Sequence, residues 1–334
     1  MSVLTALTDS WHSRFTGLFI AVLIALAATF VAEHYGGPQL LYALFFGIAL
    51  NFLNDDPRTK PGIQIAARKV LRIGVALLGA RITAEQILAI GYSQIVLVAA
   101  GVAVTISAGV LLGRLLKTVL SEGLLTGGAV AICGASAALA ISAVLPRSEH
   151  LQRYTLITVI GVTALSTLAM VIYPLITALL GLSDVQAGLF IGATIHDVAQ
   201  VVGAGYLISN EAGDTATFIK LFRVALLVPV VIFLGLLFRM ERERQSAKRP
   251  PLIQLFLIAF CTLVFINSLG FVPALVTDGL TGVSRWCLVV AIAALGMQTS
   301  FQDLTSLGWI PIVLMVGETV VLALFTLLYM YGIG

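Results

Sequence analysis

The chain has 334 residues, of which 59% are hydrophobic and only 10% charged, and its formal net charge is +3. Soluble domains carry roughly 25% charged residues, so this composition excludes a water-soluble globular protein and predicts an all-α polytopic membrane protein. The small net charge gives no indication of nucleic-acid binding, and we expect no nucleic acid among its partners.

Apolar runs along the chain predict about eleven transmembrane helices. The first run, from Phe15 to Ala32, is long enough to cross a bilayer, so it is interpreted as a retained helix and not as a cleaved signal sequence. The expected spans are residues 15–33, 38–53, 63–80, 93–116, 123–144, 152–180, 185–208, 215–238, 251–270, 284–300 and 309–331.

Two of these segments are interrupted at their middle by small and polar residues. Residues 123–144 contain Gly127, Gly128 and Gly134, and residues 188–207 contain the pair His196-Asp197. Non-helical backbone at membrane depth occurs only where it lines a protein-enclosed cavity. Paired broken helices are typical of the midplane binding site of secondary transporters. The sequence therefore predicts two discontinuous helices that cross at the midplane.

Basic residues set the expected topology. The loop from Arg239 to Pro251 carries five basic residues, which by the positive-inside rule makes it cytoplasmic. Counting eleven spans from this loop places the N-terminus in the cytoplasm and the C-terminus outside. On this count Arg147 and Arg153 fall on the outer side and disagree with the rule.

The chain also repeats itself weakly. The stretch that begins at Leu78 resembles the one that begins at Leu295, with the later glycines Gly91 and Gly308 in register. The order of the predicted spans makes the two copies run in opposite directions, which predicts inverted-repeat character. The two interrupted segments also align with each other, but at a different offset. Either one of these two alignments is a chance match, or the segments of the second half follow one another in a different order. The sequence leaves both explanations open.

Three segments of the chain are distinctive: T-G-G-A-V-A-I-C-G-A-S-A-A-L-A, G-A-T-I-H-D-V-A-Q-V-V-G-A-G and K-L-F-R-V-A-L-L-V-P-V. They resemble the YeiH-like sulfate exporters, and the resemblance extends over nearly the whole chain. It implies a bacterial inner-membrane protein related to the sodium/proton antiporters and bile-acid symporters. It also implies one transmembrane transporter domain over residues 1–334, with interleaved panel and core helices. The core is expected to include residues 123–144 and 188–207.

His196 and Asp197 are the first candidate site residues, because ionisable groups inside a membrane are costly and often functional. Histidine titrates near neutral pH, so His196 is the expected proton-linked group, and Asp197 is expected to hold the imidazole or a cation. The alternative is structural, with Asp197 capping backbone amides and His196 a satisfied core residue. Thr194, three residues before Asp197, resembles the start of a capping box for the second half-helix.

Lys220 and Arg223 are three residues apart and so share one helical face. If they point inward they supply positive charge for an anion; otherwise their long side chains reach water at the end of the span. Glu318 lies deep in the last span, where we expect it to pair with a buried cation or donor, for structure or for coupling. Gln200 lies one turn beyond His196 and offers a neutral hydrogen bond.

The first interruption has the ingredients of an anion site. Gly127, Gly128, Gly134 and Ser136 provide exposed backbone N–H groups and the positive end of a half-helix. Small residues also serve close helix packing in bilayers, so their position opposite His196 and Asp197 is what favours a site.

These features predict a secondary transporter of a small anion, sulfate or a related oxyanion, with proton or sodium coupling. A cation/proton antiporter that uses Asp197 as the cation ligand is the alternative. A less favoured reading is an intramembrane hydrolase with Ser136 as nucleophile and His196 as base. We expect no catalytic residues, cofactor or metal; the partners are the anion and the bilayer, and a homodimer is compatible with the sequence. The expected location is the bacterial inner membrane, with the N-terminus cytoplasmic and the C-terminus periplasmic.

Overall fold

The computed structural model describes residues 3–36, 38–83, 85, 91–146, 149–238, 255–270, 272–299 and 309–333. The described residues form helices joined by short turns, with no strand among them, which confirms the all-α prediction. The chain divides into two compact units, residues 1–87 with 255–300 and residues 88–254 with 301–334. The predicted single transporter domain stays a prediction, and both interrupted segments belong to the second unit.

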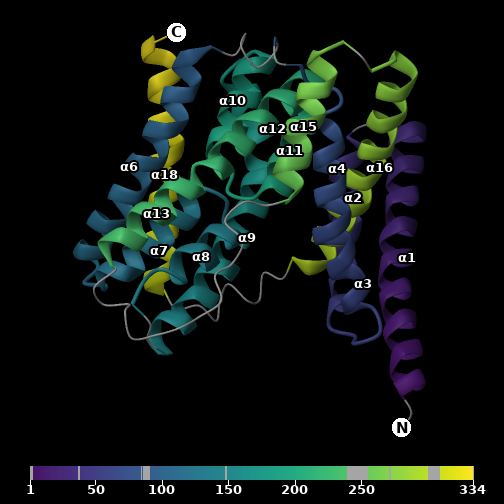
Figure 1. The fold of residues 1–334 in the computed structure, drawn as a ribbon, viewed down its shortest axis with the longest axis horizontal. Coiled ribbons are helices and arrows are strands. Elements are labelled where there is room, and N and C mark those ends of the chain that lie inside the picture. Colours follow the sequence, from purple (N-terminus) through teal and green to yellow (C-terminus); the bar gives the residue numbers. More distant parts are fainter. Residues whose placement is uncertain are drawn as a thin grey trace. The chain divides into compact units, whose positions relative to one another are not determined.

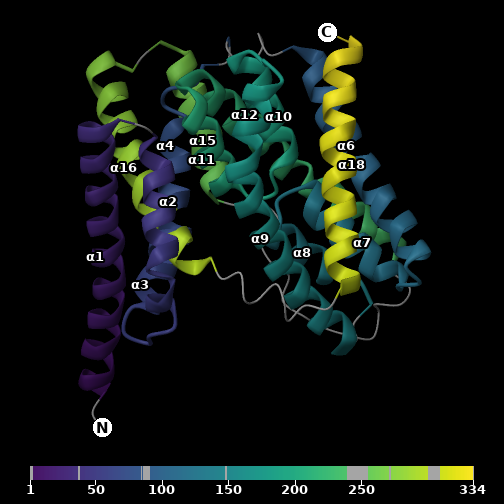
Figure 2. The ribbon, with the colours of Figure 1, turned by 180° about the vertical axis from the view of Figure 1, so that it is seen from behind.

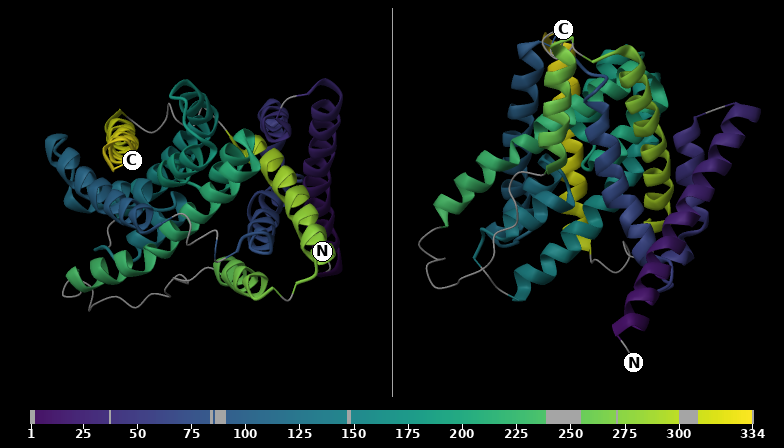
Figure 3. Two further views of the ribbon diagram at one scale, coloured as in Figure 1. Left: turned by 90° about the horizontal axis from the view of Figure 1, so that it is seen from above. Right: turned by 45° about the vertical axis from the view of Figure 1, so that its right-hand side comes forward.

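The first unit, whose helices are labelled in Figure 1, is built on close helix contacts at glycines. A Cβ on Gly47 would lie 2.2 Å from the carbonyl oxygen of Ala293, and one on Gly17 would lie 1.9 Å from that of Thr59. Such backbone approach is typical of helices that pack in bilayers. Figure 3 shows α1 beside α2 and α3. The elements of this unit are α1 (Val3–Tyr35), α2 (Gln39–Ala49), the 3-10 turn η1 (Asn51–Asn54), α3 (Lys60–Ile65), the π-helical turn η2 (Ala66–Val70), α4 (Leu71–Leu78), α15 (Leu255–Ser268) and α16 (Ala274–Gln298).

The second unit carries all the candidate site residues. In Figure 2 its helices α6 and α18 run side by side, and they are antiparallel, because Tyr329 bonds to Ser93 while Gly317 lies against Leu112. The elements of this unit are α6 (Tyr92–Leu115), α7 (Leu120–Ala131), α8 (Ala135–Ser142), α9 (Glu149–Leu179), α10 (Asp184–Thr194), α11 (Val198–Ile208), α12 (Asn210–Ala225), α13 (Leu227–Leu237) and α18 (Trp309–Ile333).

The first interrupted segment folds back on itself as a hairpin. In a straight helix Gly128 and Ile141 would be separated by about 20 Å, at 1.5 Å per residue. In the structure a Cβ on Gly128 would lie only 2.2 Å from Cδ1 of Ile141. Helices α7 and α8 therefore lie against each other, and both the start of α7 and the end of α8 are at the same end of the unit.

The second interrupted segment is also a hairpin, packed against α12. Gly192 of α10 lies against Ala216 of α12, and Gly205 of α11 lies against Ala216 and Gly213. Because both half-helices contact the same stretch of α12, α11 must return towards the end from which α10 came. The two hairpins open at opposite ends of the second unit, since α9, a single helix of 31 residues, separates them.

Within the described part of the chain, fewer helices than the predicted eleven are long enough to cross a membrane. Among the described residues six helices are long and apolar enough to cross a membrane, and three shorter apolar helices accompany them. The half-helices of the hairpins have 12, 8, 11 and 11 residues, whereas a crossing needs about 20. The prediction of two broken helices that each cross the membrane is wrong, because each pair of half-helices turns back instead of continuing. The count of about eleven spans is not confirmed.

The weak internal repeat has partial counterparts in the first unit. Gly79, early in the first copy, packs against Phe260 of α15, and Gly296, early in the second copy, packs against Leu44 of α2. Each glycine thus lies near the C-terminal end of a helix, α4 or α16, and allows close contact with an apolar helix, α15 or α2. Residues 300–308 of the second copy lie outside the described residues, and the inverted repeat stays a prediction.

Candidate functional site

The tips of the two hairpins meet inside the second unit. The first tip is the turn Ile132–Gly134, and the second is the extended stretch Ile195–Asp197. A Cβ on Gly134 would lie 3.8 Å from Cβ of His196, which belongs to the other tip. Gly134 has φ +61°, a conformation that favours glycine. The predicted breaks in the backbone, and their meeting, are thus confirmed at the predicted residues.

Arg223 ties the two tips together from α12. Its Nε donates to the carbonyl of Ala131 (2.9 Å), and its Nη2 donates to those of Val130 (2.9 Å) and Ala131 (2.6 Å). Its Nη1 donates to Gly192 (3.2 Å) and Ile195 (3.1 Å) in the other hairpin. These five bonds match the five N–H donors of a guanidinium.

Lys220 holds the same two tips one turn earlier. Its Nζ donates to the carbonyls of Ile132 (2.6 Å) and Ile195 (2.9 Å). Both basic side chains are fully buried, so the snorkelling alternative is wrong: the chain directs them inward. An ammonium has three donors, and the two bonds to carbonyls use two of them.

The carbonyls that these side chains contact are the C-terminal ends of α7 and α10. A helix end leaves its last carbonyls without partners and carries about half a negative charge. The two cations satisfy those carbonyls and offset that charge. Lys220 and Arg223 lie one turn apart on α12. Without the carbonyls, two buried like charges at this spacing would be strongly unfavourable.

His196 connects the second tip to both α7 and α18. Its Nδ1 lies 3.2 Å from the carbonyl of Val130, so this nitrogen carries a proton. Its Nε2 lies 3.0 Å from Oγ1 of Thr319, whose hydroxyl also lies 2.7 Å from the carbonyl of Met315. A hydroxyl has one proton to give. If Thr319 gives it to His196 the imidazole is neutral, and if Thr319 gives it to Met315 the imidazole is doubly protonated.

Asp197 begins α11 as its N-cap, with its carboxylate accepting from the amide of Ala199 at 3.3 Å. Its own amide donates to the buried hydroxyl of Ser166 on α9 (3.0 Å). The prediction that Thr194 starts a capping box is wrong, because Thr194 ends α10 and donates to Phe190 (2.6 Å). Asp197 itself is the N-cap residue and directly precedes α11.

The start of α8 differs from the start of α11 because its N-cap residue is a glycine. Gly134 makes no side-chain cap bond, and Ser136 donates instead to the carbonyl (3.2 Å) and Sγ (2.9 Å) of Cys133. The positive end of α8 therefore has no acidic side chain on it, unlike that of α11.

The other predicted site residues are spread around the tips. Gly127 and Gly128 lie within α7, where Gly127 allows contact with α6 and Gly128 with α8, so they serve packing and do not contact the other tip. Gln200 is buried on α11, and its Nε2 lies 3.4 Å from Oγ1 of Thr167. Its Oε1 has no hydrogen-bond partner among the described residues.

Glu318 lies on α18, adjacent in sequence to Thr319, and is fully buried. Its Oε1 accepts from the hydroxyl of Thr126 on α7 at 2.7 Å. The sequence predicted a buried donor for Glu318 but did not identify Thr126. It also missed Thr319 and Ser166, because hydroxyl residues inside apolar helices usually bond to their own helix and give no distinct signal.

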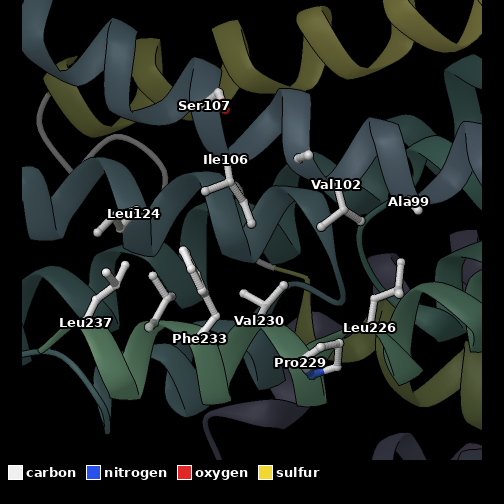
Figure 4. A pocket seen from close by; sticks show the side chains of 12 residues that line it. Ala99, Val102, Ile106, Ser107, Leu124, Leu226, Pro229, Val230, Phe233 and Leu237 are labelled. Atoms are coloured by element: carbon white, nitrogen blue, oxygen red, sulfur yellow. The ribbon is translucent and has the colours of Figure 1, made fainter. Parts of the chain in front are cut away.

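A separate cavity of about 370 Å³ lies between α6 and α13. Figure 4 shows apolar side chains from these two helices facing each other across it, among them Ile106, Val230 and Phe233. None of the predicted site residues lines this cavity. Within the described ranges no group of three or more His, Cys, Asp or Glu side chains could hold a metal ion.

Relatives of the chain are bacterial membrane proteins. The profile of the family described as "Conserved hypothetical protein 698" matches residues 16–315. The chain is 51% identical over 315 residues to a UPF0324 membrane protein of Chlorobaculum tepidum, covering 94% of this chain and 88% of the relative. It is 49% identical over 326 residues to the UPF0324 membrane protein TauZ of Paracoccus denitrificans, covering 97% and 96%. A UPF0324 membrane protein of Bacteroides thetaiotaomicron is 33% identical over 312 residues, covering 89% and 92%. The chain belongs to the UPF0324 family of membrane proteins.

Proposed function

We propose that this protein is a secondary transporter of a small anion, sulfate or a related oxyanion, that works by alternating access. The observation that carries the proposal is the meeting of two hairpin tips, opened from opposite ends of the unit, around two buried cations. Irregular backbone that is enclosed by protein at membrane depth is the usual site of a transported solute.

The charges at the tips favour an anion over a metal cation. The four half-helix ends carry about half a charge each, two of either sign, and so cancel. Lys220 and Arg223 add two positive charges and Asp197 adds one negative charge, while His196 can be neutral. The tips thus carry an excess of about one positive charge, which a bound anion would offset.

The residues that would contact the anion lie at the start of α8. The amide of Ser136 lies in the first turn of α8, at a positive helix end that no acidic side chain occupies, and protonated Lys220 has a third donor. The amide of Gly134 instead donates to the carbonyl of Ala129 (2.8 Å). The unused atom of Gln200 is Oε1, which accepts hydrogen bonds and so would not contact an anion directly. Arg223, whose donors are engaged by carbonyls, would position the tips and set their charge.

Coupling to a proton or to sodium would pass through His196, Asp197 and Glu318. The two hydrogen-bond arrangements open to Thr319 allow His196 to gain or lose a proton without losing a partner. The alternative, a cation/proton antiporter, would use the carboxylate of Asp197, which the amide of Ala199 already contacts.

The hairpins also affect which side of the membrane the basic residues of the second unit face. Because α8 returns to the end at which α7 starts, Arg153 lies at the same end of the unit as Arg114 at the close of α6, and so no longer contradicts the positive-inside rule. The end of α13, next to α8 through Gly235 and Val144, lies there too. This agrees with a cytoplasmic loop after α13 and, because α18 runs antiparallel to α6, with a C-terminus in the periplasm. We propose a cytoplasmic N-terminus as well. We propose the bacterial inner membrane as the location and a homodimer as the assembly.

The intramembrane hydrolase finds less support. Ser136 donates to Cys133, and both nitrogens of His196 have other partners. A nucleophile and its base need hydrogen-bond reach of each other, and the printed bonds of the two residues go elsewhere.

The test combines binding and transport. Purified protein is first screened by thermal shift against sulfate, sulfite, small carboxylates and sodium, since a ligand of the folded state raises its apparent stability. Uptake of labelled sulfate and sulfite into proteoliposomes follows. Lys220→Gln should weaken anion binding, whereas Lys117→Gln, at an exposed lysine after α6, should not.

The proposal fails if no anion stabilises the protein and sodium alone does so in a manner that Asp197→Asn abolishes. That result would favour the cation/proton antiporter.

A further inference from the structure

A group of polar side chains lies between α7, α9 and α18, away from the hairpin tips. Glu318 is 0% exposed and Tyr154 is 6% exposed. One oxygen of Glu318, Oε2, and the hydroxyl of Tyr154 have no hydrogen-bond partner among the described residues. Helices α7, α9 and α18 pack against one another, so these atoms share one buried region. Buried polar atoms without partners are rare and call for a role.

Thr126 can form a hydrogen bond with Glu318 whether or not Glu318 carries a proton. Its hydroxyl lies 2.7 Å from Oε1 of Glu318 and 3.0 Å from the carbonyl of Glu122. If Glu318 is ionised, Thr126 donates to it. If Glu318 is protonated on Oε1, it donates to Thr126, which then donates to the carbonyl of Glu122. Oε1 of Glu318 is hydrogen-bonded to Thr126 in both states, so Glu318 can change its charge without losing this contact.

The same group reaches the surface through Glu122 and His150. Glu122, which is 4% exposed, forms an ion pair with Nε2 of His150, and the side chain of His150 is 67% exposed. Glu122 and Thr126 share one face of α7, and His150 and Tyr154 share one face of α9, because each pair is four residues apart. Two helix faces thus line a polar strip from the surface to Glu318.

Among the described residues, the elements packed against Glu318 bring the following groups towards it. From α6 it meets the backbone at Gly109, where a Cβ would lie 2.7 Å from Oε1. Helix α7 contributes Glu122, and α9 contributes Tyr154 and His150. The α10–α11 hairpin contributes His196, through the neighbouring Thr319.

We propose that Glu318 is a proton-binding site, and that His150, Glu122 and Tyr154 form the path by which a proton reaches it from the end of the unit where α7 begins. The proposal deepens the proposed transport function, on which its biological meaning rests, by making the proton the coupling ion. No cation enters the site in this scheme, and none needs to.

The proton is accounted for at each step. The imidazolium of His150 passes it to the carboxylate of Glu122, which becomes neutral while His150 becomes neutral. Because the hydroxyl of Tyr154 has no direct hydrogen-bond partner among the described residues, buried water relays the next two transfers. Glu122 gives its proton towards the oxygen of Tyr154, and Tyr154 gives its own hydroxyl proton to Glu318. The tyrosine ends as it began, Glu122 is again ionised, and Glu318 has gone from charge −1 to neutral.

The test follows the carboxyl group of Glu318 directly, without a substrate. Purified full-length protein in lipid is examined by infrared spectroscopy for the C=O stretch of a protonated carboxyl group, which Glu318→Gln should remove. After transfer into heavy water, this band shifts as the proton is replaced by deuterium. Tyr154→Phe and Glu122→Gln should each slow that shift by about tenfold or more, as expected when a proton-transfer group is removed.

Two matched variants serve as controls. Tyr329→Phe removes a tyrosine hydroxyl on α18 that bonds to Ser93, and Glu211→Gln removes an exposed acid at the start of α12. Both should exchange at the wild-type rate.

The proposal is overturned if no carboxyl band is lost in Glu318→Gln, or if Tyr154→Phe and Glu122→Gln exchange as fast as the wild type. Because exchange is measured without an anion, its failure is distinct from failure of the transport proposal. Sulfate uptake that persists without this route would leave the anion transporter and remove the proton path. If the exchange rates are as expected but no anion is transported, the proton path stands and the anion transporter does not.

Discussion

Removing the side chain of Arg223 should destabilise the second unit more than any other single change at the tips. In Arg223→Met the side chain keeps its length, but four carbonyl groups, on Val130, Ala131, Gly192 and Ile195, lose a charged donor. Removing one partner from a buried charged contact costs about 3–5 kcal/mol. We take this range, and not a sum over five bonds, because the hairpin tips can relax.

The assay is thermal unfolding of the purified protein in detergent. At roughly 2 °C per kcal/mol for a unit of about 200 residues, the melting temperature should fall by about 6–10 °C. Arg223→Lys keeps the charge but has fewer donors and no planar fork, so it should lose about half as much. If Arg223→Met does not accumulate in cells, Arg223→Lys can be measured in its place.

The matched control is Arg114→Met at an exposed arginine on α6, which should melt within about 2 °C of the wild type because surface substitutions have small effects. A melting temperature of Arg223→Met equal to that of this control would refute the view that Arg223 holds the hairpin tips together.

Two further changes test the packing and the charge at the site. Gly109→Ala places a Cβ 2.5 Å from the carbonyl oxygen of Gly123, so it should separate α6 from α7 and cost about 1–3 kcal/mol, measured by thermal unfolding; Gly235→Ala, with its nearest neighbour at 3.8 Å, should leave stability unchanged. Asp197→Asn keeps a good helix cap but removes the charge, so the protein should melt near the wild-type temperature and yet lose anion-dependent transport in proteoliposomes. Transport at the wild-type rate would show that Asp197 is only a cap.

The sequence identified the interruptions but not the direction of the chain after them. Gly134 and the His196-Asp197 pair are out of place in an apolar helix, and the backbone breaks at both. Whether the chain then continues or turns back depends on a contact such as that of Gly128 with Ile141. Such a contact between residues thirteen apart has no periodic signal. Because the two short halves add up to about one membrane thickness, they read as a single crossing.

The orientation of Lys220 and Arg223 was open in the sequence for a related reason. Both lie within reach of the polar start of α12, so a snorkelling side chain was equally consistent with their positions. Their inward direction follows from the carbonyls at the ends of α7 and α10, which exist only after both hairpins have formed. Glu122 was missed because it stands just before an apolar run, where an acid reads as part of a loop; its burial comes from packing of α7 against α6 and α9.

Helix α18 offers a physical link between the proposed proton site and the hairpin tips. Glu318 and Thr319 are consecutive, so their side chains leave the helix about 100° apart; one contacts Thr126 on the first hairpin and the other contacts His196 on the second. In both contacts a threonine hydroxyl has one proton and two acceptors, so the protonation of the ionisable partner decides which acceptor it bonds. A proton gained by Glu318 reverses the direction of its bond to Thr126, whose hydroxyl then donates to the carbonyl of Glu122 on its own helix. A proton gained by His196 reverses its bond to Thr319 in the same way. The two hairpins are therefore joined to α18 by bonds whose direction depends on protons, while Arg223, which stays charged, joins both of them to α12, and motion of the tips should be about α12.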